Sequence, residues 1–302
     1  MSGSIRIYDT TLREGFAGVG TAVSVDQAVA IARALEKAGV SAIEAGYPAQ
    51  SPAQRDIVTA VAGAVRASEV AALAACDPAE TAAAVHAVGR AAKPLVHVYL
   101  PARAACDAGG RVEVCRAIQE AVAAVRAAGP EVQFSIAGME TMERPFRRQC
   151  IGVAVDAGAT RIAVPDSTGA METAAYAELV RDIVQFVGPR ITVSAHCHNA
   201  SGRAVQNALA AIDAGASQVE TTVRGIGPSG GNTALEDIAG RIRGRAGTCT
   251  VDRRAVAAMA SLMPETHIRE CAEGVCAARD AALSGAPASR PEWYCLVEVA
   301  AL

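Results

Sequence analysis

Two histidines separated by one residue are the first feature of this sequence that could do chemistry. His196 and His198 stand in the stretch SAHCHN, at the end of an apolar run. If this run is a β-strand, side chains two positions apart point to the same face, so both imidazoles project together while Cys197 points away. Two imidazoles on one face can share a cation. The alternative is a pair of unrelated histidines at a strand end.

Polar or ionic residues also stand at the ends of several other apolar runs. They are Asp9, Arg13, Glu14, Glu44, Asp166 and Asn232. Each alone could be a helix cap or a surface charge, but together on one rim they would form a site. Two imidazoles with a carboxylate and an amide oxygen suit Mg²⁺, Mn²⁺, Co²⁺ or Zn²⁺ with open water positions. A structural zinc site would use thiolates instead.

A glycine-rich turn follows the histidines. Its sequence, GIGPSG at Gly225–Gly230, matches the G-x-G-x-x-G pattern of dinucleotide-binding folds, and Asp252 stands at about the expected distance beyond it. The stretch after Asp252 is too short to complete such a fold. We therefore favour a phosphate- or ligand-facing turn after the last strand, with dinucleotide binding as a minor alternative.

These groups need elements that bring them to one rim. The expected strands are Ile5–Asp9, Ala42–Gly46, Val70–Ala74, Leu95–Leu100, Val132–Ile136, Arg161–Pro165, Ile191–His196 and Gln218–Val223. The alanine-rich helices between them include Val25–Ala38, Ala79–Ala91, Glu113–Ala128, Thr173–Val187 and Ala204–Ala214, several of which end in a glycine typical of a C-cap. Eight strands alternating with helices predict an α/β fold, a (β/α)8 TIM barrel whose strand ends form the active-site face. An open doubly wound sheet is the alternative.

The bulk properties limit the possible partners and the domain organisation. We expect a barrel domain over residues 1–245 and a short, partly helical C-terminal appendage over 246–302. The formal net charge of −3 gives no reason to expect nucleic acid or an anionic membrane surface. No apolar run reaches the ~18 residues of a membrane span. With no apolar signal segment before the first charges, and with nine irregularly spaced cysteines that suggest reduced thiols, we expect a cytoplasmic protein.

Four longer stretches resemble the DRE-TIM metallolyase family, which includes homocitrate synthase, isopropylmalate synthase and hydroxymethylglutaryl-CoA lyase. They are YDTTLREG at Tyr8–Gly15, IEAGYPAQSPAQRDIV at Ile43–Val58, VPDSTGAMET at Val164–Thr173, and the long block HCHNASG to NTALED at His196–Asp237. The resemblance covers about Ile5 to Ile242. It implies a metal-dependent barrel enzyme with an α-keto acid and an acyl-CoA as its small-molecule substrates. We also expect a homodimer.

The resemblance also implies a metal centre. The family's ligands fall on Glu14, His196 and His198, with Asn232 on or near a divalent ion that would be Mg²⁺, Mn²⁺, Zn²⁺ or Co²⁺. Arg13 then falls where it would polarise the keto acid and stabilise the developing alkoxide, because a guanidinium stays charged at any working pH.

Further site residues come from the same segments and from their surroundings. Glu44 is a candidate catalytic group, as is His267, the histidine that follows the expected barrel. Ser167 is a candidate substrate contact. Arg203 and Arg224 stand where related sequences generally carry uncharged residues, so they could bind an additional anionic group of the keto acid. The alternative is that both are surface arginines.

The chain also departs from the family pattern. Phe16-Ala17 stands where the synthases usually carry a glutamine, and Ala200 replaces an aspartate. The loop before Asn232 lacks both the glutamate-arginine pair of the synthases and the catalytic cysteine of the lyases. The segment that supplies a histidine to the synthases after the barrel is absent.

Three functions therefore remain in competition. The first is a Claisen-type condensation, in which an acyl-CoA such as acetyl-CoA attacks a metal-bound α-keto acid and thioester hydrolysis yields a 2-hydroxy-2-alkyl diacid. The second is a retro-aldol or retro-Claisen lyase that uses the same metal. The third is a non-catalytic relative that keeps the barrel as a binding surface. The retained Arg13, Glu14, His196, His198 and Asn232 argue against the third, and we favour the first.

Overall fold

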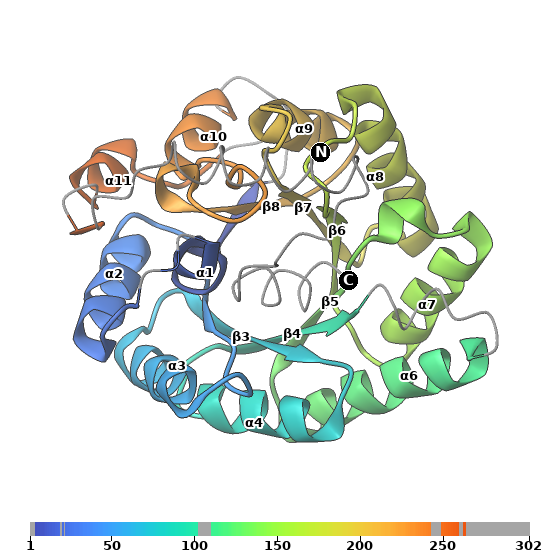
Figure 1. Ribbon diagram of the computed structural model, residues 1–302, viewed down its shortest axis with the longest axis horizontal. Helices are drawn as coiled ribbons and strands as arrows, with labels where there is room; N and C mark the ends of the chain where they lie inside the picture. Colours follow the sequence, from blue (N-terminus) through green and yellow to red (C-terminus); the bar gives the residue numbers. More distant parts are fainter. Residues whose placement is uncertain are drawn as a thin grey trace, which may run out of the picture.

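Eight parallel strands follow one another in chain order around a closed barrel, viewed along its axis in Figure 1. This computed structural model describes residues 4–18, 20, 22–101, 110–242, 249–259 and 262–263. The strands are β1 Arg6–Asp9, β2 Ala42–Gly46, β3 Glu69–Ala75, β4 Pro94–Leu100, β5 Glu131–Ile136, β6 Arg161–Asp166, β7 Thr192–Cys197 and β8 Gln218–Thr221. The last strand pairs with the first, from Arg6 with Gln218 to Asp9 with Thr221. This closure confirms the predicted TIM barrel and excludes the open sheet.

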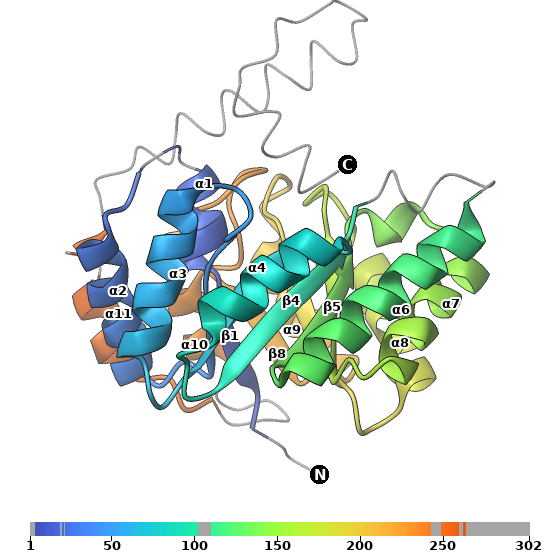
Figure 2. The ribbon, with the colours of Figure 1, turned by 90° about the horizontal axis from the view of Figure 1, so that it is seen from below.

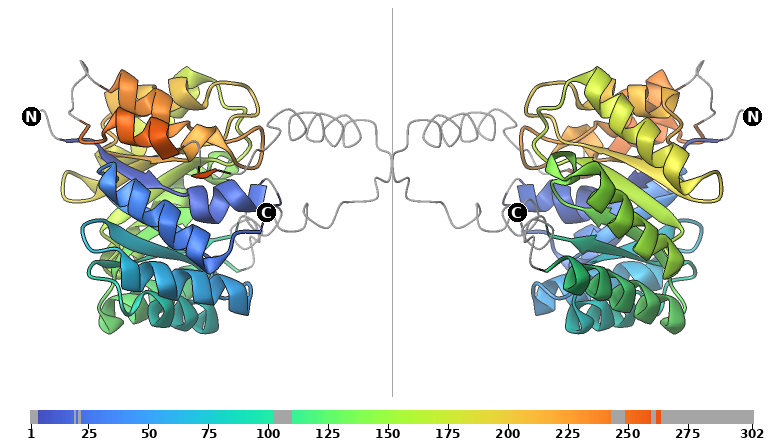
Figure 3. Two further views of the ribbon diagram at one scale, coloured as in Figure 1. Left: turned by 90° about the vertical axis from the view of Figure 1, so that its left-hand side faces the viewer. Right: turned by 90° about the vertical axis from the view of Figure 1, so that its right-hand side faces the viewer.

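Helices surround the barrel, as the two side views of Figure 3 show. They are α2 Val25–Lys37, α3 Pro52–Ala64, α4 Pro78–Val88, α6 Arg111–Ala128, α7 Arg144–Asp156, α8 Thr173–Val187, α9 Ala204–Asp213 and α10 Leu235–Arg241. Local signals in the sequence start several of them. Ser24, for example, forms a capping box with Gln27 at the start of α2, which satisfies backbone donors that no residue inside the helix can reach.

Glycines end two of the helical units at the repeated sequence DAGA. Gly158 follows α7 with φ of 112°, and Gly215 follows α9 with φ of 110°. A side chain at either position would be strained in this backbone conformation, which a glycine adopts freely. The sequence signal for the helix ends is thus confirmed at both units.

The two faces of the strands differ in polarity. Side chains that point outward pack against the helices in the main hydrophobic core, whereas Tyr8, Ala42, Ala71 and Leu95 form a small apolar cluster of their own. Much of the remaining inward-pointing surface is polar and buried. It includes Glu44, His97, Gln133, Ser135, Arg161, Ser194, His196, Gln218 and Glu220. Buried polar groups need hydrogen-bond partners, so this interior has to be a connected network.

The segments after β1 and β7 place the chemistry. A π-helical turn, Thr11–Gly15, follows β1 directly and leads into the short α1, Phe16–Gly18, which lies at the upper end of the barrel in Figure 2. β7 ends at Cys197, so His198 lies just beyond the strand and forms an isolated bridge with Asn232.

The described part of the expected C-terminal appendage contains one helix, α11, Arg253–Met259, which packs against α2 and α10. Asp252, just before this helix, donates its backbone N–H to Ala38 O over 2.8 Å. The remainder, residues 264–302, lies outside the described residues together with the helix expected there, and the division at 245/246 stays a prediction.

Candidate metal centre and adjoining cavities

Three side chains from the two ends of the barrel sequence converge on one point. Glu14 Oε1 lies 3.3 Å from His198 Nε2, and Glu14 Oε2 lies 3.4 Å from His196 Nε2. The two Nε2 atoms are 3.3 Å apart. All three side chains are buried, with 5 to 8% of their surface exposed. Each offers one ligand atom, and these atoms are close enough to share a metal ion.

The electrostatics of this cluster favour a cation. Burial raises the pKa of Glu14, but the charges of Arg13 and the two histidines more than offset it, so that the pKa lies well below its usual range. Burial lowers the pKa of His196, and Glu14 and Glu220 raise it to about 10. Among the described residues, Glu14 Oε2 has no hydrogen-bond partner. A buried carboxylate oxygen facing two imidazole nitrogens fits a divalent metal ion.

Asn232 lies beside this cluster through its backbone. It is buried and bridges to His198, and its side-chain Nδ2 donates to Ile226 O over 3.4 Å. Gly227 packs so closely against the amide that an added Cβ would lie 2.0 Å from Nδ2. Because Gly227 has no side chain, the side-chain amide of Asn232 can lie directly against the backbone of the glycine turn. The assignment of Asn232 as a ligand stays a prediction.

Arg13 lies against the metal cluster and is held from behind by Glu44. Its Nε donates to Glu44 Oε2 over 2.7 Å, and its terminal nitrogen lies 3.4 Å from Glu14 Oε2. The other oxygen of Glu44 is 2.9 Å from His97 Nδ1, and Thr10 Oγ1 donates to Oε2 over 2.6 Å. Glu44 is fully buried and does not line the cavity at the metal cluster. Both of its oxygens are occupied by these contacts, which favours a role in holding Arg13, and the assignment of Glu44 as a catalytic group stays a prediction.

A small cavity of about 50 Å³ opens directly over the cluster. Its lining residues are Arg13, Glu14, Leu73, His97, Tyr99, Ser135, Ala137, Ala163, Pro165, Ser167, His196, His198 and Glu220. Ser167 lies in this wall, and its Oγ accepts a hydrogen bond from Gly138 N over 2.8 Å. Its role as a substrate contact stays a prediction. Small side chains from β5 and β6 therefore face Glu14, His196 and His198 across the cavity.

The structure does not bring the two candidate anion-binding arginines to this wall. Arg203 forms an ion pair with the exposed Glu172. Arg224 is exposed on a turn with a positive φ of 61°, where its backbone N–H donates to Glu236. Neither lines the cavity at the cluster or the larger one beside it, and their assignment as substrate-binding residues stays a prediction. His267 lies outside the described residues.

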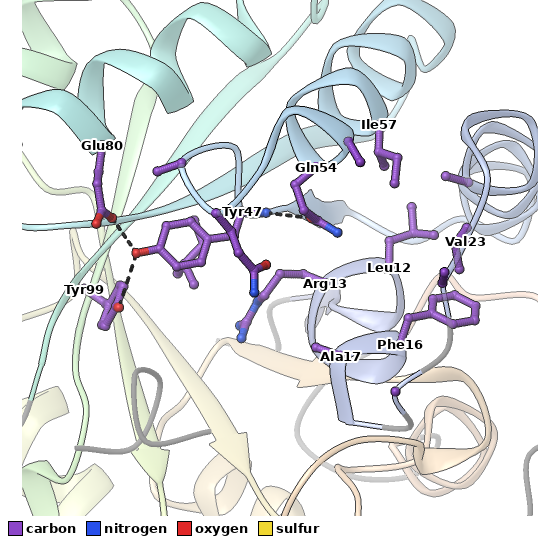
Figure 4. Close-up of a pocket in the computed structure, with 17 residues that line it drawn as sticks. Leu12, Arg13, Phe16, Ala17, Val23, Tyr47, Gln54, Ile57, Glu80 and Tyr99 are labelled. Atoms are coloured by element: carbon purple, nitrogen blue, oxygen red, sulfur yellow. Dashed lines mark hydrogen bonds between the residues drawn. The ribbon is translucent and has the colours of Figure 1, made fainter. Parts of the chain in front are cut away.

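A second cavity, of about 610 Å³, adjoins the first and shares Arg13, Leu73 and Tyr99 with it. Figure 4 shows its apolar side, from Leu12, Phe16, Val23 and Ile57, and its polar end. At that end, Tyr47 donates its hydroxyl to Glu80 over 2.5 Å and lies 3.4 Å from the Tyr99 hydroxyl.

The sequence interpretation missed four residues of this site. His97 and Tyr99 lie two apart in the stretch VHVYL, so strand alternation could have placed both inside the barrel. Glu220 stands in the same inward register on β8, where it contacts His196. No such pattern marks Glu80, which comes from the first turn of α4.

Comparison with known proteins finds relatives of the kind that the sequence motifs indicated. The model of the family described as HMGL-like matches residues 4–263. The 2-isopropylmalate synthase of Saccharolobus solfataricus is 36% identical over 241 residues, covering 78% of this chain and 62% of that protein. The 2-isopropylmalate synthase of Staphylococcus aureus is 39% identical over 245 residues, 79% of this chain and 48% of that protein. The chain thus spans less than two thirds of the length of these relatives.

Solved structures share the fold at low sequence identity. Hydroxymethylglutaryl-CoA lyase from Pseudomonas aeruginosa superposes with a TM-score of 0.72 at 19% identity, covering 92% of this chain and 99% of that one. The carboxyl transferase domain of Rhizobium etli pyruvate carboxylase, solved with pyruvate, gives 0.71 at 15% identity, covering 90% and 49%. Among the described residues, no helix is long and apolar enough to cross a membrane. The homodimer and the cytoplasmic location stay predictions.

Proposed function

Because this chain belongs to the HMGL-like family, we propose that it is a divalent-metal-dependent enzyme that condenses an acyl-CoA with an α-keto acid. The observation that carries this proposal is the convergence of Glu14, His196 and His198 beside the guanidinium of Arg13. Relatives named 2-isopropylmalate synthase support the direction of synthesis.

Glu14, His196 and His198 would hold the metal, with Asn232 as a further oxygen ligand. A divalent ion bound there supplies Lewis-acid polarisation of the keto group and of the adjacent carboxylate. The nature of the ion, among Mg²⁺, Mn²⁺, Zn²⁺ and Co²⁺, is part of what has to be measured.

Arg13 stabilises the charge that develops at the keto oxygen. Its Nε is occupied by Glu44, which fixes the guanidinium and leaves the other N–H groups for the substrate. A charged donor held in place before the reaction stabilises an oxyanion without reorganisation. On the opposite wall, Ser167 can donate its hydroxyl hydrogen to the carboxylate of the keto acid.

The two cavities divide the substrates between them. The keto acid occupies the small cavity at the metal, and the acyl end of the acyl-CoA enters from the larger one, which shares Arg13, Leu73 and Tyr99 with it. In the reaction, the acyl-CoA loses a proton from the carbon next to its carbonyl, and that carbon bonds to the keto carbon. The keto oxygen takes up a proton, and hydrolysis then releases coenzyme A.

The side chain of the keto acid is small and apolar. Within the described part of the chain, Arg13 is the only arginine or lysine that lines either cavity. A second anionic group would face Leu73, Ala137, Ala163 and Pro165 with neutral donors such as Ser135 nearby but without a second lysine or arginine, which is costly in a buried site. We therefore replace the expected additional anionic group with a short alkyl chain.

The test is to supply the chelator-treated chain with each divalent ion, acetyl-CoA and a panel of keto acids, and to follow thiol release. Metal-dependent thiol release that requires a keto acid is the expected result. Cleavage of the 2-hydroxy diacid without condensation would identify a lyase instead. Absence of both reactions, together with absence of metal binding, would leave only a non-catalytic relative.

A further inference from the structure

We infer that Glu220 is a positioning residue of the metal centre, which fixes the tautomer and the orientation of His196. This inference rests on the proposed metal site and adds to it a residue that does not contact the ion. Glu220 Oε2 lies 2.8 Å from His196 Nδ1, on the side of the imidazole away from Glu14.

Neighbours inside the barrel hold the Glu220 carboxylate rigidly. Its other oxygen, Oε1, accepts one hydrogen bond from Ser194 Oγ and one from Gln133 Nε2, both of 3.0 Å. Gln218 donates in turn to Gln133 and to Ser194, which fixes both donors. Glu220 is 2% exposed and projects from β8, so it cannot turn towards solvent.

The contact decides which nitrogen of His196 can bind a metal. An ionised carboxylate only accepts hydrogen bonds, so Nδ1 must carry the hydrogen and donate it. In the neutral ring, Nε2 then keeps its lone pair, and this is the atom that faces Glu14 and His198. A carboxylate behind a ligating imidazole also makes the imidazole more basic and a stronger ligand.

The two histidines differ in this support. His198 Nδ1 faces the carbonyl oxygen of Pro228 over 3.4 Å, which is a longer contact to a neutral acceptor. Both rings therefore present Nε2 to the ion, but only His196 has a carboxylate group behind it. We expect the carboxylate behind His196 to matter more for metal affinity than the carbonyl behind His198.

Charge balance supports the same role. Four charged groups contact one another or His196 at the cluster, namely the guanidinium of Arg13 and the carboxylates of Glu14, Glu44 and Glu220. A bound metal would displace the hydrogen from His196 Nε2 and leave both imidazoles neutral. The four groups then sum to two negative charges, which one divalent ion balances. Without Glu220 the loaded site would carry an excess positive charge in a buried place, which is unfavourable.

Titration of chelator-treated protein with Zn²⁺ against a chromogenic chelator tests the inference. Glu220→Gln keeps the size of the side chain and removes its charge, and we expect it to weaken Zn²⁺ binding by ~10- to 100-fold. Ser194→Ala is the matched control, because it removes one neutral hydrogen bond from the same carboxylate and leaves the contact to His196. It should change Zn²⁺ affinity by less than ~3-fold.

A second measurement needs no variant that might misfold. In Zn²⁺-loaded wild-type protein with ¹⁵N-labelled histidine, NMR should show the hydrogen of His196 on Nδ1. A hydrogen on Nε2, or a Glu220→Gln protein that folds and binds Zn²⁺ as tightly as wild type, would overturn the role of Glu220 alone. A wild-type protein that binds no Zn²⁺, Mn²⁺, Mg²⁺ or Co²⁺ would overturn the proposed function as well.

Discussion

Arg13 and Glu44 form a buried ion pair in which the guanidinium Nε donates to the carboxylate Oε2 over 2.7 Å. Glu44 is also bound by His97 and Thr10, so the pair is anchored to two further elements of the barrel. The guanidinium can therefore turn little, and its free N–H groups stay beside Glu14 at the metal cluster. A charge that would be mobile on the surface is thus held in one direction.

Removal of the Arg13 guanidinium should lower turnover strongly. We expect Arg13→Ala to reduce kcat by ~10²-fold or more, as for other oxyanion donors. Arg13→Lys should restore little, because an ammonium cannot contact Glu44 and a substrate oxygen in the same planar arrangement. Arg203→Ala is the matched control, since that arginine pairs with Glu172 outside both cavities. Near-normal turnover in Arg13→Ala would remove the assigned role.

Glu44 should matter through Arg13 and not as a base. Burial raises its pKa, but the charge of Arg13 and the hydrogen bond from His97 hold it well below the usual range. Glu44→Gln should therefore lower kcat without moving the acidic limb of the pH–rate profile. It should also lower the free energy of unfolding by ~3 to 5 kcal/mol, because a buried guanidinium loses its partner. Disappearance of the acidic limb in this variant would show that Glu44 is a base after all.

Metal removal should abolish activity reversibly. Treatment with a chelator should stop thiol release, and one of Mg²⁺, Mn²⁺, Zn²⁺ or Co²⁺ should restore it. His198→Ala should lose both metal and activity but still unfold cooperatively, because the residue lies beyond the end of β7. His86→Ala, on the exposed side of α4, controls for the loss of an imidazole. Full activity of the chelated protein would show that the reaction does not use the metal.

The contribution of Asp9 to the free energy of unfolding should decrease as the pH rises. Burial raises its pKa to about 7, although hydrogen bonds with Thr11 and Thr221 oppose this. In the unfolded chain the Asp9 carboxyl ionises near pH ~4. Between about pH 4 and 7 this carboxyl therefore loses its proton in the unfolded state only, and the free energy of unfolding falls. The free energy of unfolding of wild type, measured relative to that of Asp9→Asn, should therefore fall as the pH rises through this window. Urea unfolding of chelator-treated protein measures it.

The exposed Asp26, replaced by Asn, controls for the change of residue type in that experiment. Its difference from wild type should not follow the same curve. If the Asp9→Asn difference is the same at about pH 4.5 and about pH 8, Asp9 ionises alike in the folded and unfolded states and the expectation fails.

Substrate size should be set by Leu73, which lines both cavities. Pyruvate and 2-oxobutyrate should give a higher kcat/KM than oxaloacetate or 2-oxoglutarate. Leu73→Ala should favour 2-oxoisovalerate over pyruvate by ~10-fold relative to wild type, because the freed space can bury the two additional carbons of 2-oxoisovalerate at ~0.8 kcal/mol each. Arg224→Ala should leave the ranking unchanged. A preference for oxaloacetate that disappears in Arg224→Ala would restore the role first expected for this arginine.

The sequence was informative wherever a fixed period or a local turn controlled the outcome. Strand alternation placed His196 and His198 on one face. Short apolar runs between helical stretches predicted all eight strands, with their ends within one or two residues of those observed. Glycines with a positive φ ended the helices before Ala159 and Ala216 as the repeated DAGA indicated. These features depend on backbone geometry, which neighbouring residues decide.

The tertiary structure decided which charges face the metal and which do not. Glu44, Arg203 and Arg224 were alike as candidates in the sequence, yet one is buried behind Arg13 and two lie outside the cavities. Closure of the barrel brought Glu14, in the turn after β1, next to the end of β7, and it brought Glu220 behind His196. Sequence periodicity gives the direction of each side chain from its own strand. Which groups then meet depends on the register and closure of all eight strands, since a buried charge is stable only where partners from other strands satisfy it.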